Sequence, residues 1–189
     1  MGELKADWVA RHKLTVDDYY RLGEAGILRE DSRVELIAGE LIDWAPIGSR
    51  HAGFINKIAE RLRAGSGQTA IVAIQNPLRL STESEPQPDV ALLRPRADYY
   101  AEKHPEPADV LLVIEVADTS LRYDREIKIP LYAQHGVAET WLVDIEKRQV
   151  MVYDELYDGV YQRVTNFGIA ATISPQCLPM LALELAELF

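Results

Sequence analysis

The chain has 189 residues, of which 48% are hydrophobic and 26% are charged, and its formal net charge is −10 at pH 7. This composition predicts one folded domain over residues 1–189 and argues against a disordered chain. The acidic balance argues against broad attraction to nucleic acid, because a basic surface supplies most of that affinity.

The sequence indicates neither a membrane span nor a secretory route. Its longest unbroken apolar run, Val110 to Ile114, is far shorter than the roughly 20 residues that a spanning helix needs. The opening residues MGELKADWVARHK contain no apolar core typical of a signal peptide, and a lone Cys177 excludes an internal disulfide. We therefore expect a cytoplasmic protein that makes no membrane contact.

Helical and hairpin patterns occupy the first part of the chain. Residues 15–23 (TVDDYYRLG) are typical of a short helix capped by Thr15, and residues 34–44 (VELIAGELIDW) favour a hairpin. Residues 50–63 (RHAGFINKIAERLR) predict an amphipathic helix. The polar face of that helix carries three basic residues, Arg50, Lys57 and Arg61.

The remainder is expected to be mainly extended. Strand candidates are residues 69–75, 77–80, 89–93, 110–118, 139–144, 148–155 and 161–167. Residues 121–134 have helical spacing interrupted by Pro130, and residues 181–189 fit either a helix or a tail docked on the core. Mixed strands with flanking helices indicate an α/β fold.

Glu115 is a carboxylate inside the apolar strand candidate 110–118. Alternation predicts one face formed by Leu111, Val113, Glu115 and Ala117, and an opposite face formed by Val110, Leu112, Ile114 and Val116. A strand that is apolar on both faces should be central, where an ionised carboxylate is costly without a cation, a donor or water. Taken alone, Glu115 is also explained by an arginine partner or by an exposed edge strand.

Asp89 has a related setting, since it follows Pro88 and opens an apolar strand candidate. Taken alone, a Pro-Asp turn explains it. Two carboxylates on neighbouring strands can, however, converge on one Mg²⁺ ion, which polarises a phosphodiester and lowers the pKa of a bound water. A nearby lysine would position that water and offset the developing charge.

Lys128 is the nearest candidate for such a lysine. It follows Asp124 by four residues, so an exposed helical ion pair is the alternative. Pro130 either kinks a helix near Glu126 or opens a new helix with Lys128 just before it. Both cases place Lys128 at a backbone irregularity.

Four motifs occur together in one chain: RVELIAGEL, a basic helix containing His51, QPDVALL, and the block VLLVIEVADTSLRYDREIKIPLYAQHGVAETWLVD. This combination resembles the Uma-type family of restriction-endonuclease-like proteins, which is assigned to the PD-(D/E)XK nuclease superfamily. The resemblance implies a mixed sheet flanked by helices and a phosphodiesterase that depends on Mg²⁺ or Mn²⁺. It matches Asp89 to the PD element and Glu115 to the acid of (D/E)XK, with the Val116 carbonyl as a third metal ligand.

The chain departs from the superfamily pattern at one position. A lysine is expected two residues after the acid, where this sequence has Ala117. The family resemblance assigns that role to Lys128 in the following helical segment. It also makes Glu35 a further acidic ligand, although a solvent-facing hairpin glutamate is an equal alternative.

Other polar residues are candidates for contacts with nucleic acid. His51 opens the amphipathic helix and could contact phosphate, and Arg50, Lys57 and Arg61 could form a phosphate-facing stripe. A solvated helix face is the alternative for all four. No glycine-rich phosphate loop, zinc-ligand spacing or GxSxG motif is present in the sequence.

Three hypotheses follow. The first is a Mg²⁺-dependent endonuclease that hydrolyses DNA, with Asp89 and Glu115 as metal ligands, Lys128 assisting, and a homodimer expected by analogy. The second is a nuclease-fold module that binds DNA or a protein partner without catalysis. The third keeps the metal site but places another phosphorylated substrate in it.

Overall fold

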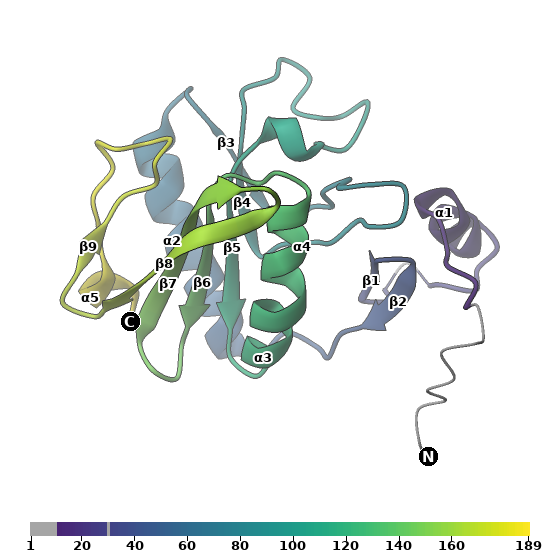
Figure 1. The fold of residues 1–189 in the computed structure, drawn as a ribbon, viewed down its shortest axis with the longest axis horizontal. Helices are drawn as coiled ribbons and strands as arrows, with labels where there is room; N and C mark the ends of the chain where they lie inside the picture. Colours follow the sequence, from purple (N-terminus) through teal and green to yellow (C-terminus); the bar gives the residue numbers. More distant parts are fainter. Residues whose placement is uncertain (1–10, 30) are drawn as a thin grey trace.

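A six-stranded mixed sheet forms the centre of the structure, a computed structural model that describes residues 11–29 and 31–189. Its strands lie in the order β3 (Ile71–Ile74), β4 (Val90–Leu93), β5 (Val110–Ala117), β6 (Thr140–Asp144), β7 (Gln149–Tyr157) and β8 (Val160–Gly168). Neighbouring strands are antiparallel, except that β5 and β6 are parallel. The predicted mixed sheet with flanking helices is confirmed (Figure 1).

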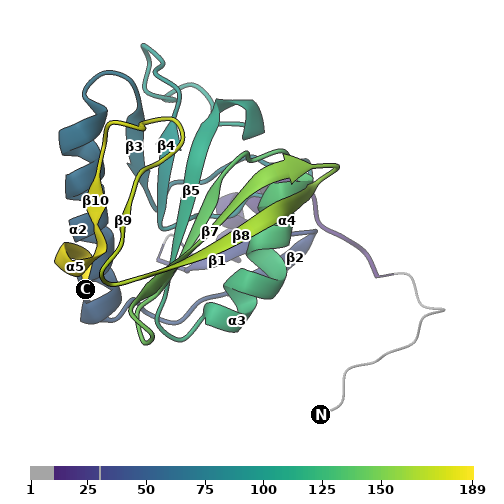
Figure 2. The same cartoon turned by 60° about the vertical axis from the view of Figure 1, so that its left-hand side comes forward.

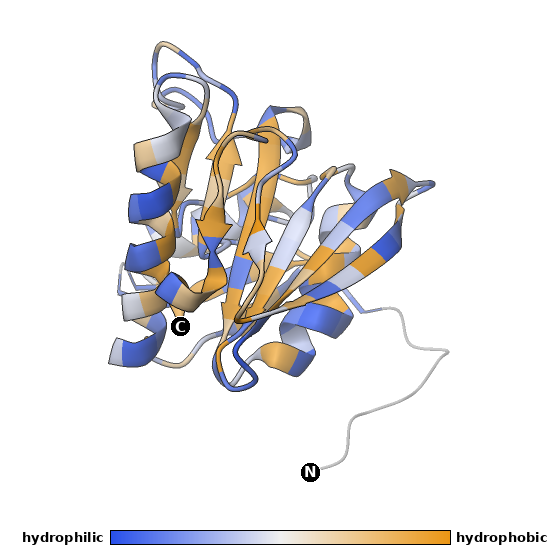
Figure 3. Ribbon diagram, turned by 90° about the vertical axis from the view of Figure 1, so that its left-hand side faces the viewer, coloured by the Kyte–Doolittle hydropathy of each residue, from blue (hydrophilic) through white to orange (hydrophobic). Residues whose placement is uncertain are grey.

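Helices cover both faces of this sheet (Figure 2). The long helix α2 (Ser49–Ser66) packs its apolar side, including Ile58 and Leu62, onto one face. The crossover between β5 and β6 covers the other face, where α4 (Ile129–Gln134) contributes Tyr132 to a second cluster. Hydrophobic colour is concentrated in the central strands, and α2 carries many hydrophilic residues (Figure 3).

Strand β5 is interior to the sheet and buried almost throughout, as its two apolar faces predicted. The predicted alternation fails only at its start. Val110 packs with Val113, whereas Leu111 packs on the α2 side, because the pairing of β4 with β5 shifts register at Leu92/Leu93. Glu115 therefore occupies a fully covered central strand.

The crossover is a continuous helical path with a widened turn in its middle. It runs through α3 (Leu121–Tyr123), a π-helical segment (Asp124–Lys128) and α4, which has Pro130 in its first turn. Because proline has no N–H to donate backwards, the wider turn accommodates it without ending the helix. Lys128 thus lies at the irregularity that was predicted, inside a helical path.

The predicted N-terminal elements are confirmed. Helix α1 (Val16–Glu24) begins after Thr15, whose hydroxyl accepts from the Asp18 N–H in a capping box. Strands β1 (Val34–Ile37) and β2 (Glu40–Asp43) form the hairpin, with φ of 79° at Gly39 in its turn. Residues 1–10, in which we expected no signal peptide, lie outside the described residues.

The strand prediction for residues 77–80 is wrong. Leu78 and Leu80 are buried, but their N–H groups donate to Pro86 and Ser84 of the adjoining loop instead of to a sheet strand. Burial of alternate leucines produced the strand-like pattern without a strand partner.

Short elements complete the fold. A 3₁₀ turn (Pro107–Asp109) precedes β5, and β9 (Thr172–Ile173) pairs with β10 (Leu183–Glu184). The last residues form helix α5 (Leu185–Leu188), which packs Leu185 and Leu188 into the α2-side core. Within residues 11–29 and 31–189, none of the helices has the length and apolar composition that crossing a bilayer requires.

Candidate functional site

Asp89 and Glu115 meet at one end of the paired strands β4 and β5. The register pairs Val90 with Ile114, so Asp89 lies beside Glu115, and the Asp89 N–H points at Glu115 Oε2 over 3.4 Å. Asp89 Oδ2 also accepts from the Val116 N–H over 2.9 Å. Both residues are almost fully buried, at 8% exposure for Asp89 and 2% for Glu115. The two predicted carboxylates therefore converge.

Lys128 reaches this pair from the π-helical segment. Its Nζ lies 2.9 Å from Glu115 Oε1, and the residue is 3% exposed. Ala117, where the superfamily pattern has lysine, is buried in an apolar cluster with Ile129 and Leu142. A lysine at that position would lose apolar packing, whereas Lys128 brings its ammonium to the same carboxylate from another element.

Glu35 joins the cluster from strand β1. Its Oε1 lies 3.4 Å from Lys128 Nζ, and the residue is 5% exposed, so the alternative of a solvent-facing glutamate is wrong. Its Oε2 is buried and has no hydrogen-bond partner among the described residues. The N-terminal hairpin thus closes one side of the carboxylate cluster.

Three side chains hold the Asp89 and Glu115 carboxylates in place. The Tyr132 hydroxyl donates to Glu115 Oε1 over 2.5 Å, and Gln75 Nε2 donates to Asp89 Oδ1 over 3.2 Å. His51 Nε2 lies 2.9 Å from Asp89 Oδ2, so this histidine contacts the carboxylate predicted to bind metal. Such contacts orient metal-ligating groups.

Asp124 is a member of the site that the sequence did not reveal. It is 3% exposed, and its Oδ2 accepts from the Ser120 hydroxyl over 2.6 Å. Its four-residue spacing from Lys128 suggested an exposed ion pair, but the widened turn buries both residues. Only this spacing pointed to Asp124, and the spacing alone does not distinguish a surface pair from a buried one.

The electrostatics of the site reflect four carboxylates, Glu35, Asp89, Glu115 and Asp124, gathered around one lysine. Burial raises the pKa of Glu115 to about 8, although the Lys128 charge opposes the shift. Burial likewise raises the pKa of Asp124 to about 6. Burial lowers the pKa of Lys128, but Glu115 and Glu35 outweigh it and hold that pKa above its ordinary value. The lysine stays charged, and the excess negative charge favours binding of a cation.

A pocket of about 560 Å³ opens onto these residues. The hairpin and the segment after it form one wall, through Trp44 and Ile47 among others, and the start of the crossover forms another. Arg50 lies near this pocket, where it pairs with the lining residue Asp118 over 3.5 Å and donates to the Ile145 carbonyl.

The basic stripe on α2 divides between two neighbourhoods. His51 lines the pocket, but Lys57 donates to the Leu188 carbonyl and Arg61 pairs with Glu187 over 2.7 Å. Lys57 and Arg61 are therefore engaged by α5 and do not line the pocket. Their predicted contact with nucleic acid stays a prediction.

The donor set suits a small divalent cation. Among residues 11–29 and 31–189, no three or more His, Cys, Asp or Glu side chains are arranged to enclose a metal by themselves. Mg²⁺ does not require this, because it is commonly held by one or two carboxylates and keeps several waters. Asp89 and Glu115 would supply the carboxylates, and the Val116 carbonyl points to the same side of β5 as the N–H that contacts Asp89. The unpartnered Glu35 Oε2 is a further free oxygen at the site.

Comparison with known proteins is consistent with this geometry. No curated protein matches the chain. A solved structure titled "Crystal structure of a putative nuclease belonging to DUF820 from Anabaena variabilis ATCC 29413" superposes with a TM-score of 0.74. The match covers 93% of this chain and 97% of that one at 18% identity, which shows a shared fold.

The sequence itself matches a family described as "Uma2: Putative restriction endonuclease" over residues 16–186. This match takes in β1, α2, the paired strands β4 and β5, and the crossover that carries Lys128. The chain therefore belongs to the Uma2 family of nuclease-like proteins.

Proposed function

We propose that this protein is a metal-dependent endonuclease that hydrolyses DNA phosphodiester bonds, with Mg²⁺ or Mn²⁺ held by Asp89, Glu115 and the Val116 carbonyl. The position of Lys128 carries the proposal. Its Nζ lies 2.9 Å from Glu115 Oε1 although the residue comes from the crossover and not from β5. Lys128 thus brings an ammonium group to the carboxylate that a lysine at position 117 would serve in the superfamily pattern.

The residues divide the work as follows. A divalent ion bound here would supply Lewis-acid polarisation of the phosphodiester and an acidified water. Asp89 and Glu115 are held for that purpose by His51, Gln75 and Tyr132. Lys128 keeps its proton, so it acts as a donor that orients the attacking water and offsets developing negative charge, not as a base.

The direct test is a cleavage assay with Mg²⁺ or Mn²⁺ on linear, supercoiled and single-stranded DNA. We expect Asp89→Asn and Glu115→Gln to lose about 10³-fold in rate, because several kcal/mol of charge stabilisation disappear with the ion. Lys128→Ala should lose about 10²- to 10³-fold. Glu146→Gln and Lys147→Ala, exposed in the turn after β6, are matched controls that should keep wild-type rates.

The proposal fails if the three site variants cut as fast as the wild type, or if no DNA is cut under any condition.

A second candidate, a nuclease-fold module that binds DNA or a protein without cutting, is favoured by one observation. Lys57 and Arg61 are occupied by α5, which leaves the chain of net charge −10 with few free cations on α2. Calorimetry separates the two, since a catalytic site should bind Mn²⁺ in a manner that depends on Asp89 and Glu115. The expected homodimer is tested by light scattering.

A further inference from the structure

One wall of the candidate active site is aromatic and carries polar atoms without partners. Trp44, just after β2, and Tyr123, at the end of α3, meet edge to face with ring centres 5.0 Å apart. Trp44 Nε1 and the Tyr123 hydroxyl are buried, and neither has a hydrogen-bond partner among residues 11–29 and 31–189. Both residues line the pocket. Since buried donors are rarely left unsatisfied, this wall is suited to a ligand that brings acceptors.

The wall lies next to the residues proposed to act on the phosphodiester. Lys128 Nζ lies over the Trp44 ring, 5.4 Å from its centre, while the same atom contacts Glu115. A ligand group against Trp44 would thus be a neighbour of the reacting phosphate.

The burial of the site argues against a stacked duplex as the bound form. Asp89, Glu115 and Lys128 are at most 8% exposed, so a phosphodiester must enter the pocket to reach them. Duplex DNA keeps its bases stacked inside and its backbone on a wide cylinder. An unpaired strand can bend a single nucleotide inwards, as other enzymes with recessed sites require.

The charge of the pocket also argues against duplex DNA as the bound form. Among the described residues, the pocket lining contains two lysine or arginine side chains, Arg33 and Lys128. It contains six carboxylates, Glu35, Asp43, Asp89, Glu115, Asp118 and Asp124. Duplex binders commonly neutralise about 6–10 phosphates with basic side chains, which the lining of this pocket does not offer. Binding of a single strand can rely instead on stacking against aromatic rings.

We propose that the pocket binds an unpaired nucleotide of a single strand, with the base against Trp44 and Tyr123 and the adjoining phosphodiester at Asp89 and Glu115. Every nucleobase carries at least one edge acceptor, so a base of any sequence brings an acceptor to the wall that holds the unpartnered indole N–H and phenol O–H. The cleavage part of this inference rests on the proposed function, whereas the binding part does not.

Binding is measured with the full chain in Ca²⁺, using fluorescein-labelled oligothymidylate and a hairpin duplex of equal length. We expect the single strand to bind at least about 10-fold more tightly than the duplex, and to quench the protein's tryptophan fluorescence. Trp44→Ala should weaken single-strand binding about 10-fold or more, whereas Trp44→Phe should keep most of the affinity and lose the quench. Tyr157→Ala, an exposed aromatic at the far end of β7, is the control and should bind as the wild type does.

The thermal midpoint and Mn²⁺ affinity of Trp44→Ala must match the wild type, or else Trp44→Phe and Tyr123→Phe are used, which keep the rings. Duplex binding as tight as single-strand binding, or no binding of either probe, overturns the inference, as does unchanged affinity in Trp44→Ala. Cleavage separates the two proposals. If duplex is cut and single strands are not, the proposed function stands and this inference fails. If single strands bind in a Trp44-dependent manner but no DNA is cut, this inference stands and the proposed function fails.

Discussion

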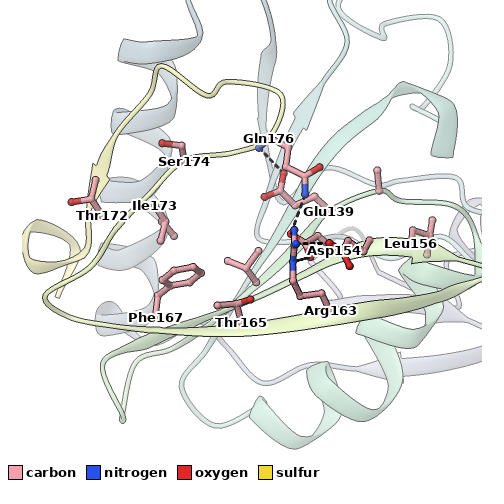
Figure 4. Close-up of a pocket in the computed structure, with 13 residues that line it drawn as sticks. Glu139, Asp154, Leu156, Arg163, Thr165, Phe167, Thr172, Ile173, Ser174 and Gln176 are labelled. Carbon is pink, nitrogen blue, oxygen red and sulfur yellow. Dashed lines mark hydrogen bonds and ion pairs between the residues drawn. The ribbon is translucent and has the colours of Figure 1, made fainter.

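Two pockets of this protein contain buried charge, and they differ in how completely the buried polar groups are paired. The larger, of about 850 Å³, lies between strands β7 and β8 and the segment around β9 (Figure 4). There Arg163 forms two 2.7 Å hydrogen bonds with Asp154, and Glu139 accepts from Trp141 Nε1 and the Gln176 N–H. None of these residues has a buried polar atom without a partner.

In the carboxylate pocket, by contrast, four acidic side chains share one buried lysine. Three buried polar atoms, on Glu35, Trp44 and Tyr123, have no partner among the described residues. The polar groups named in the Arg163 pocket have partners within the chain, whereas the carboxylate pocket contains the three unpartnered atoms. Pocket size alone favours the Arg163 pocket, whereas unsatisfied hydrogen bonds favour the carboxylate pocket as the candidate site.

The largest expected difference between the pockets concerns removal of the cation. Lys128→Met should lower the free energy of unfolding by about 3–5 kcal/mol, because it leaves Glu115 and Glu35 buried without a counter-charge. Arg163→Met should cost less, because half of the Arg163 side chain is exposed and the buried Asp154 carboxylate keeps its hydrogen bond from Gln176 Nε2. Urea unfolding at pH 8 measures both, and equal losses would contradict the contrast.

The free energy of unfolding, measured over a pH series, tests the role of the buried Glu115 in this comparison. The folded-state pKa of Glu115 is raised by burial from 4.5 to about 8, so its favourable contribution is complete below about 4.5 and is lost as pH rises to about 8. Wild-type stability should therefore fall with rising pH across this window, by about 1 kcal/mol per pH unit at its steepest. Glu115→Gln should show a flatter profile. Parallel profiles for the two proteins would show that Glu115 does not titrate there.

Mn²⁺ should stabilise the folded protein by binding at the carboxylate pocket only. At a Mn²⁺ concentration of about 100 times Kd, binding adds about 2.7 kcal/mol, which corresponds to about 5–10 °C in Tm for a chain of this size. Asp89→Asn should abolish the shift, and Asp154→Asn in the other pocket should retain it. The measurement is a thermal scan with and without Mn²⁺. A shift that survives in Asp89→Asn would place the metal elsewhere.

Local patterns in the sequence predicted the parts of the structure that depend on near neighbours. The hairpin at residues 34–44, the amphipathic helix and the buried strand around Glu115 all follow from periodicity. Burial of Glu115 marked it as unusual, and the motif resemblance supplied Lys128, which spacing alone would have assigned to a surface ion pair. The family and the fold were predicted correctly.

The features that local patterns did not reveal share a cause, since each depends on the partner that a segment meets in the folded chain. The segment 77–80 has the right alternation, yet its hydrogen bonds go to the loop at residues 84–86. Tyr132 contacts Glu115 only because the crossover returns over β5. Lys57 and Arg61 look like a free basic stripe until α5 folds against them. The sequence of a helix predicts which of its faces is polar, but not which other element covers that face.

The smallest expected effect tests whether the hydrogen bonds around the carboxylates tune metal binding. Tyr132→Phe removes the hydroxyl that donates to Glu115 Oε1 over 2.5 Å and should weaken Mn²⁺ binding about 10- to 100-fold. Tyr161→Phe is the matched control on β8, because its hydroxyl donates to the Val137 carbonyl over 2.8 Å and touches no carboxylate. Calorimetry should find wild-type affinity in Tyr161→Phe. If both variants bind Mn²⁺ equally well, Tyr132 only fills space in the core, and the difference between the pockets lies in the carboxylates and their lysine alone.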